Sequence, residues 1–78
     1  MVFEKLARIL AENIGADEED ITLETELKPE YGIEPVDIAK MIIECEKEFN
    51  ITIHDEDVHT FKKLEDVVVY VNKIISDI

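Results

Sequence analysis

The chain has 78 residues, with 20 Asp and Glu against 8 Lys and Arg, a formal net charge of −12 and a single cysteine, Cys45. The length allows one domain, residues 1–78, with little room for an enclosed catalytic cleft, and the lone cysteine excludes an internal disulfide. The acidic balance argues against nucleic-acid binding, and no apolar run approaches the roughly 20 residues of a membrane span. We therefore expect a cytoplasmic monomer that is not an enzyme.

Residues 2–14 are predicted to form a helix. Their apolar side chains recur three or four positions apart, and charged residues occupy the opposite side. The members of this apolar face are Phe3, Leu6, Ala7, Leu10 and Ile14. Gly15 follows directly and is a typical helix stop.

Residues 16–34 carry no sustained period and are predicted to form a long structured loop. Pro29 and Gly32 break any helix there, and the acidic run at 17–20 has room for one short helical turn. Apolar residues are scattered through this loop, and we expect them to hold it across the core. They are Ile21, Leu23, Leu27, Tyr31 and Ile33.

A second long helix is predicted over residues 35–49. Pro35 suits its first turn, where a missing N–H leaves no bond unmade, and Asp37 lies where the helix dipole favours an acid. The expected buried stripe is Ile38, Ile42, Cys45 and Phe49, with Val36, Ala39 and Ile43 beside it.

The chain after this helix is predicted to form a connector and a short helix. Residues 51–53 favour extended backbone, but one short segment cannot make a sheet, so they are expected to connect the helices. Asp55 is expected to cap a short helix over about residues 56–61, with Val58 and Phe61 facing inward.

The last helix is predicted over residues 64–77. Its apolar face comprises Leu64, Val67, Val68, Val71, Ile74, Ile75 and Ile78. Three consecutive valines at 67–69 are poor helix formers, so tertiary burial must override their preference. A strand at 66–71 is the alternative, but the chain offers it no partner strand. The predicted fold class is therefore all-α, with three long helices and one short helix.

Three stretches of the chain resemble one family of carrier domains. Residues 32–37, Gly-Ile-Glu-Pro-Val-Asp, lie where the acyl carrier proteins of fatty acid and polyketide synthesis have a Gly-x-Asp-Ser-Leu-Asp motif. Residues 44–53 resemble the acidic end of that family's second helix and the turn after it, and residues 61–72 resemble its last helix. The resemblance runs from about residue 14 to residue 72 without a gap. It implies an acyl-carrier-like four-helix bundle with a long loop between the first two helices.

The resemblance places Pro35 at the position of the family's attachment serine. In the family, that serine takes a phosphodiester from coenzyme A, and the resulting phosphopantetheine arm holds the acyl group. Proline has no hydroxyl, so no phosphodiester can form there and we expect no cofactor. Ser76, the only serine, lies at the far end of the last helix without the motif. The chain is thus predicted to be an acyl-carrier-like domain that lacks its attachment site.

The leading functional hypothesis is a protein-interaction module in fatty acid, polyketide or related biosynthesis. The equivalent helix of carrier proteins docks on basic surfaces. The resemblance therefore implies a partner protein with a basic patch, such as a biosynthetic enzyme. The candidate partner-binding residues are Glu34, Val36, Asp37, Lys40, Glu44 and Glu48.

Two alternatives remain open. In the first, the chain is an acyl carrier that holds its acyl group on Cys45 or noncovalently between helices, although a buried core position is the ordinary role of such a cysteine. In the second, it is a cation-responsive acidic domain, because His54 and His59 lie beside the acidic residues 55–57 and imidazole and carboxylate both bind metals. The spacing of these residues matches no specific metal motif, so no metal site is predicted.

Overall fold

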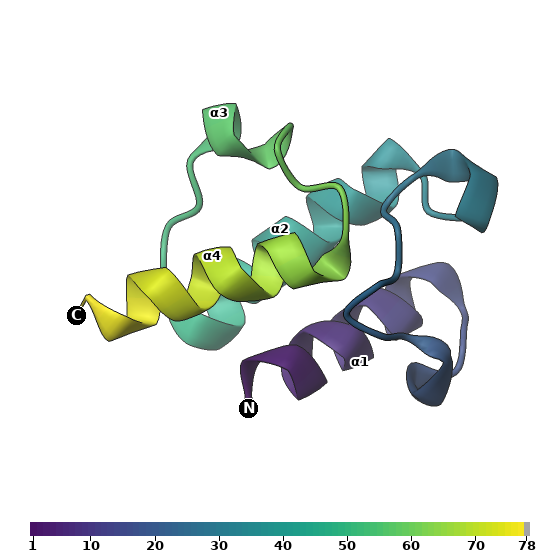
Figure 1. Cartoon of the computed structure of the whole chain (residues 1–78), viewed down its shortest axis with the longest axis horizontal. Helices are drawn as coiled ribbons and strands as arrows, with labels where there is room; N and C mark the ends of the chain where they lie inside the picture. Colours follow the sequence, from purple (N-terminus) through teal and green to yellow (C-terminus); the bar gives the residue numbers. More distant parts are fainter. Residues whose placement is uncertain (78) are drawn as a thin grey trace.

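The structure, a computed structural model, describes residues 1–77, and this part of the chain holds four α-helices (Figure 1). Their bounds are Val2–Ile14 for α1, Pro35–Phe49 for α2, Asp55–Val58 for α3 and Leu64–Ser76 for α4. The long loop between α1 and α2 contains two 3-10 turns, η1 at Glu18–Asp20 and η2 at Pro29–Tyr31. The all-α fold class and the three long helices are confirmed.

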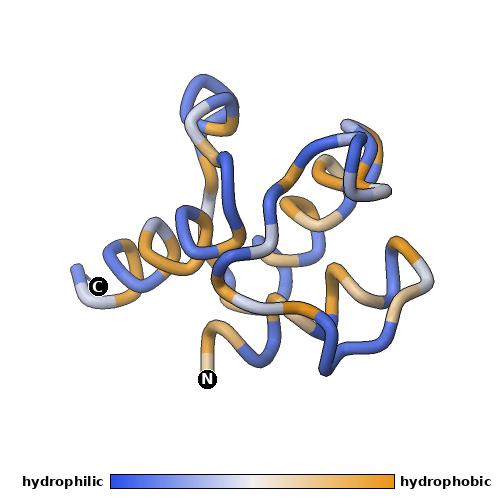
Figure 2. Tube along the Cα trace, turned by 45° about the vertical axis from the view of Figure 1, so that its right-hand side comes forward, coloured by the Kyte–Doolittle hydropathy of each residue, from blue (hydrophilic) through white to orange (hydrophobic). Residues whose placement is uncertain are grey.

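The core lies where α1 packs against both α2 and α4. Each of these helices contributes fully buried side chains, namely Leu6 and Leu10 from α1, Met41 from α2, and Val67 and Val71 from α4. Apolar and polar positions alternate around each long helix, so that each has one apolar face (Figure 2). Full burial of such a side chain stabilises the fold by roughly 1.5–3 kcal/mol, which outweighs the weak helix propensity of the valine run.

The long loop is tied to the start of α4 by backbone hydrogen bonds. The Leu27 N–H donates to the Lys62 carbonyl at 2.8 Å, and the Leu64 N–H donates to the Thr25 carbonyl at 2.9 Å. Three of the expected loop anchors are buried, namely Ile21, Leu27 and Ile33. The loop is therefore structured, as predicted, and it positions the start of α2.

Two of the expected loop anchors, Leu23 and Tyr31, are exposed, so that part of the prediction was wrong. Leu23 contributes its backbone instead, because its carbonyl accepts the Glu65 N–H at 3.0 Å. Tyr31 lies at the surface in η2, where the Lys28 ammonium sits 5.4 Å from the centre of its ring. The loop is held at these points by main-chain bonds and a surface contact, neither of which a hydropathy pattern reports.

The short helix α3 differs from the prediction in length and in its cap. It has four residues rather than the expected span of about 56–61, and Asp55 is its first residue. His54 holds the cap position without a side-chain bond. The Thr60 hydroxyl and the Thr60 N–H both donate to the Asp57 carbonyl, at 2.6 and 3.1 Å, and this tight turn ends the helix.

Burial in α4 is concentrated in its first two turns. The buried residues of this helix are Leu64, Val67, Val68 and Val71. Ile75 was expected to face inward, but 38% of it is exposed, because it lines an open groove beside the start of α1. Figure 1 shows α4 running on toward the C-terminus. The helix ends at Ser76, one residue before the predicted end, and Ile78 lies outside the described residues.

Asp66 stabilises the start of α4, and its loss should be measurable. Its Oδ2 accepts the N–H groups of Lys63 (3.0 Å) and Lys62 (2.9 Å), which holds the pKa of the Asp66 carboxyl below its usual value. We expect Asp66→Ala to lower the free energy of unfolding, measured by urea denaturation at neutral pH, by about 1 kcal/mol. The exposed Glu65 gives the matched control, Glu65→Ala, for which we expect a much smaller loss.

The pH dependence follows from the direction of this pKa shift. A carboxyl whose pKa is lower in the folded state stabilises the fold above its unfolded-state pKa, and the contribution is lost as the pH falls through the folded-state pKa. The deficit of Asp66→Ala should therefore shrink in acid. Equal losses for both alanine variants at neutral pH would show that Asp66 has no special role.

Candidate functional site

The candidate site centres on the junction between the long loop and α2. Gly32 has a φ of 80°, in the left-handed region that favours glycine, and it precedes the buried Ile33. Glu34 is extended, with φ −83° and ψ 161°, because a proline ring disfavours helical backbone in the residue before it. Pro35 is the first residue of α2, so the helix begins where the sequence predicts.

Asp37 closes the first turn of α2. Its Oδ2 accepts the Glu34 N–H at 2.9 Å, and its own N–H donates to the Glu34 carbonyl at 2.9 Å. Asp37 is half-buried in this turn, whereas Glu34 and Val36 are exposed. The junction thus presents Glu34 and Val36 outward while Asp37 fixes its shape.

The centre of the outward face of α2 carries lysine and apolar side chains. This centre, which we call the outer stripe, consists of four exposed residues spaced three or four positions apart, Val36, Lys40, Ile43 and Lys47. Val36 and Ile43 are 57% and 53% exposed, so their expected place beside the buried stripe was wrong, and the same holds for Ala39. The physical reason is that α1 covers only the opposite side of α2, where Met41, Ile42 and Cys45 are buried.

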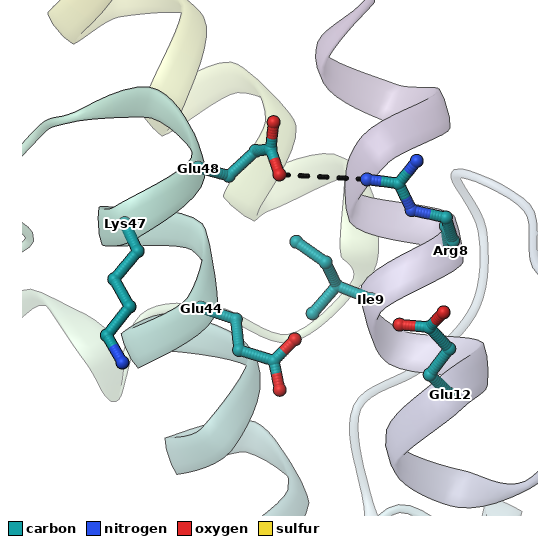
Figure 3. Close-up of a pocket in the computed structure, with 6 residues that line it drawn as sticks. All are labelled: Arg8, Ile9, Glu12, Glu44, Lys47 and Glu48. Carbon is teal, nitrogen blue, oxygen red and sulfur yellow. Dashed lines mark ion pairs between the residues drawn. The ribbon is translucent and has the colours of Figure 1, made fainter.

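Glu48 faces α1 and is engaged there. One of its carboxylate oxygens lies 3.2 Å from Lys5 Nζ and the other lies 3.6 Å from an Arg8 guanidinium nitrogen. Figure 3 shows the Arg8 pair, with Lys47 pointing away from α1. The three charged groups form an ion-pair cluster between the two helices, which sequence reasoning missed. The spacing of Lys5 and Arg8 on one face of α1 was the available signal.

Glu44 points into the groove between α1 and α2, and Glu12 reaches toward it from α1 (Figure 3). Apart from Asp37, which closes the first turn of α2, the predicted partner-binding residues fall into two groups. Glu34, Val36 and Lys40 lie at the start of α2 and along the outer stripe. Glu44 and Glu48 lie on the flank of α2 that faces α1.

Cys45 is fully buried in the core, as predicted. Burial raises the pKa of its thiol to about 12, and the carboxylates of Glu46 and Glu48 add to the shift. The nucleophile in thiol chemistry is the thiolate, so a thiol with this pKa is unreactive near neutral pH. The geometry thus argues against Cys45 as a covalent acyl site.

Thiol labelling measures the reactivity of Cys45 directly. At pH 8 on the order of one Cys45 in ten thousand is a thiolate, so we expect Ellman's reagent to label the folded protein at least about a thousandfold more slowly than free cysteine. Full labelling should follow on unfolding in guanidinium, which serves as the control. Rapid labelling of the folded protein would restore the alternative in which Cys45 holds an acyl group.

One of the side chains that prompted the cation hypothesis has another partner. The Asp57 carboxylate accepts the Tyr70 hydroxyl at 2.7 Å, and the backbone N–H of His54 donates to the same hydroxyl at 3.4 Å. Within residues 1–77, no three His, Cys, Asp or Glu side chains gather in a way that would hold a metal ion. In the same range, no helix has the length and apolar character needed to cross a membrane.

Known proteins similar to this chain support the same fold. The family described as phosphopantetheine attachment site matches residues 4–71. The acyl carrier protein of Phytoplasma australiense is 36% identical over 97% of this chain and 100% of its own length. That of Onion yellows phytoplasma is 37% identical over 94% and 96% of the two chains, and that of Clostridium perfringens strain 13 is 35% identical over 92% and 95%.

The helical fold and the loop–helix junction define a small carrier-type domain. The chain belongs to the phosphopantetheine attachment site family, and its resemblance to acyl carrier proteins is confirmed. Proteins of this kind are carriers rather than enzymes, and they interact with biosynthetic enzymes. The junction and the outer stripe are therefore candidates for a contact surface and not for an active site.

Proposed function

We propose that this chain is an acyl-carrier-like domain without a phosphopantetheine arm, which acts as a protein-interaction module in fatty acid, polyketide or related biosynthesis. The observation that carries the proposal is Pro35 at the first position of α2, where the resemblance puts the family's attachment serine. The turn at Gly32, the extended Glu34 and the Asp37 bond give this junction a defined local shape. In this proposal the chain keeps the setting for attachment and lacks the attaching side chain.

The chemistry of attachment supports the proposed absence of a phosphopantetheine arm. A serine hydroxyl attacks the phosphorus of coenzyme A that bears the pantetheine arm, forms an O–P bond and gives up its proton, while the pyrophosphate P–O bond breaks and adenosine 3′,5′-bisphosphate leaves. The proline ring offers only C–H bonds and cannot begin this step. Ser76 ends α4, on the opposite side of the molecule from the start of α2 (Figure 1). Cys45 is fully buried. Neither side chain is a replacement at the junction.

The second part of the proposal is docking on a basic surface. The net charge of −12 favours encounter with basic partners. Glu34 supplies a carboxylate at the start of α2, Glu44 supplies another along its flank, and Val36 and Ile43 offer apolar contact between them. Glu48 contributes less, because its carboxylate is paired with α1.

Restoring a serine tests the proposed loss of the attachment site. We expect Pro35→Ser to gain the mass of one phosphopantetheine when incubated with coenzyme A and a promiscuous phosphopantetheinyl transferase. The natural chain and Pro35→Ala should keep their masses, because neither has a hydroxyl at the junction. Serine is accepted at a helix start, so circular dichroism should show all three proteins equally helical.

A folded Pro35→Ser variant that stays unmodified would show that residue 35 is not in a working recognition motif. A gain of mass by the natural chain would show that another residue holds the arm, and peptide mapping would locate it. Either result would overturn the proposal, in different ways.

Competition with a true carrier tests the docking part. We expect the natural chain to inhibit the transferase when the substrate is a serine-bearing acyl carrier protein, because both present the same motif surface. The double variant Glu34→Lys/Glu44→Lys should raise the inhibition constant about tenfold at low salt, and less at high salt because salt screens exposed charges. Asp37 is left unchanged because it closes the first turn of α2.

The matched control is Glu18→Lys/Glu19→Lys, which makes the same change of charge in the exposed turn η1. We expect this control to change the inhibition constant less than the double variant does. Equal effects of the two variants would mean that net charge, and not the surface of α2, determines docking.

A further inference from the structure

The short helix α3 stands apart from the other helices, at the top of an arch of chain that joins α2 to α4 (Figure 1). The arch is anchored by the buried side chains of Ile53 on one side and Phe61 on the other. Of residues 54–60, which we call the α3 segment, only Asp57 and Val58 are partly buried. The segment therefore has little apolar contact with the core.

The hydrogen bonds within the α3 segment hold its shape but do not attach it to the bundle. The Asp57 N–H donates to the His54 carbonyl at 2.9 Å, and the Thr60 N–H donates to the Asp57 carbonyl at 3.1 Å. A helix of one turn is not stable by itself in water. The position of the segment thus depends on its contacts with neighbouring elements.

Tyr70 of α4 makes the polar contact with the α3 segment. Its hydroxyl donates to Asp57 Oδ2 at 2.7 Å and accepts the His54 N–H at 3.4 Å. Its ring packs edge-on against Phe61, with the ring centres 5.2 Å apart and the planes at 76°. The Tyr70 side chain thus contacts α3, its cap residue His54 and the buried anchor Phe61.

The bond between the Tyr70 hydroxyl and the Asp57 carboxylate is of the stronger kind. A hydrogen bond to a charged group contributes more than a neutral one because the acceptor is ionised. Burial and the Asp57 carboxylate raise the pKa of Tyr70, so the hydroxyl keeps its proton near neutral pH. The donor is therefore present under ordinary conditions.

We infer that Tyr70 is a latch that holds the α3 segment closed, and that its release lets the segment open while α1, α2 and α4 stay packed. The segment borders a groove of about 360 Å³ between α2 and α3, whose lining includes Ile42, Ile43 and Val58. Opening the latch widens this groove and uncovers its apolar wall. The latch is a conformational device independent of the proposed function, because it does not depend on what residue 35 carries.

Amide hydrogen exchange of the full chain, followed by mass spectrometry, tests the latch. Tyr70→Phe removes the hydroxyl but keeps the ring that packs on Phe61. We expect exchange in peptides covering residues 54–60 to become roughly tenfold to a hundredfold faster, because a bond to a charged group is lost. Exchange in α1 and α2 should change less than about twofold, since opening is local.

A second pair of variants controls for the case in which Tyr70→Phe has a folding defect. Asp57→Ala removes the acceptor from the side of the segment, and Glu56→Ala is its matched control because Glu56 is exposed next to it. We expect Asp57→Ala to reproduce the faster exchange, Glu56→Ala not to do so, and the double variant Tyr70→Phe/Asp57→Ala to add little. Unchanged exchange in both single variants, or equally faster exchange in every helix, would overturn the latch.

Discussion

The geometry of the junction depends on the first turn of α2, which the bond from the Glu34 N–H to the Asp37 carboxylate closes, and the Pro35 ring supports that turn. The ring fixes the backbone where α2 begins and holds Glu34 in extended conformation. With Glu34 extended, its N–H reaches the Asp37 carboxylate in the first turn of the helix. The same ring offers no nucleophile at the first position of α2, and this is the physical basis of the proposed function.

The rest of the fold keeps that junction in place from two directions. Burial of Leu10, Met41 and Val67 fixes α2 and α4 against α1. Main-chain bonds from the long loop to the start of α4 set where the loop meets α2. The outer stripe of α2 is left uncovered because the core uses only the opposite side of that helix. The proposed contact surface and the core are therefore two faces of α2.

Periodicity predicted the three long helices and the burial of Cys45, because a helical pattern of apolar residues reports directly on which face is covered. It misplaced Val36 and Ile43, since the width of the covered stripe depends on how closely α1 approaches α2. It also missed the pairing of Glu48 with α1, which requires knowing which faces meet. The end of α3 escaped prediction because a bond from Thr60, and not a break in hydropathy, closes it.

The most direct test of the central claim is the intact mass of the protein recovered from its own cells. We expect the mass of the unmodified chain, apart from any processing of the N-terminal methionine, because no side chain at the start of α2 can form the phosphodiester. A mass greater by one phosphopantetheine, on whichever residue, would contradict it and would make this chain a carrier in the ordinary sense.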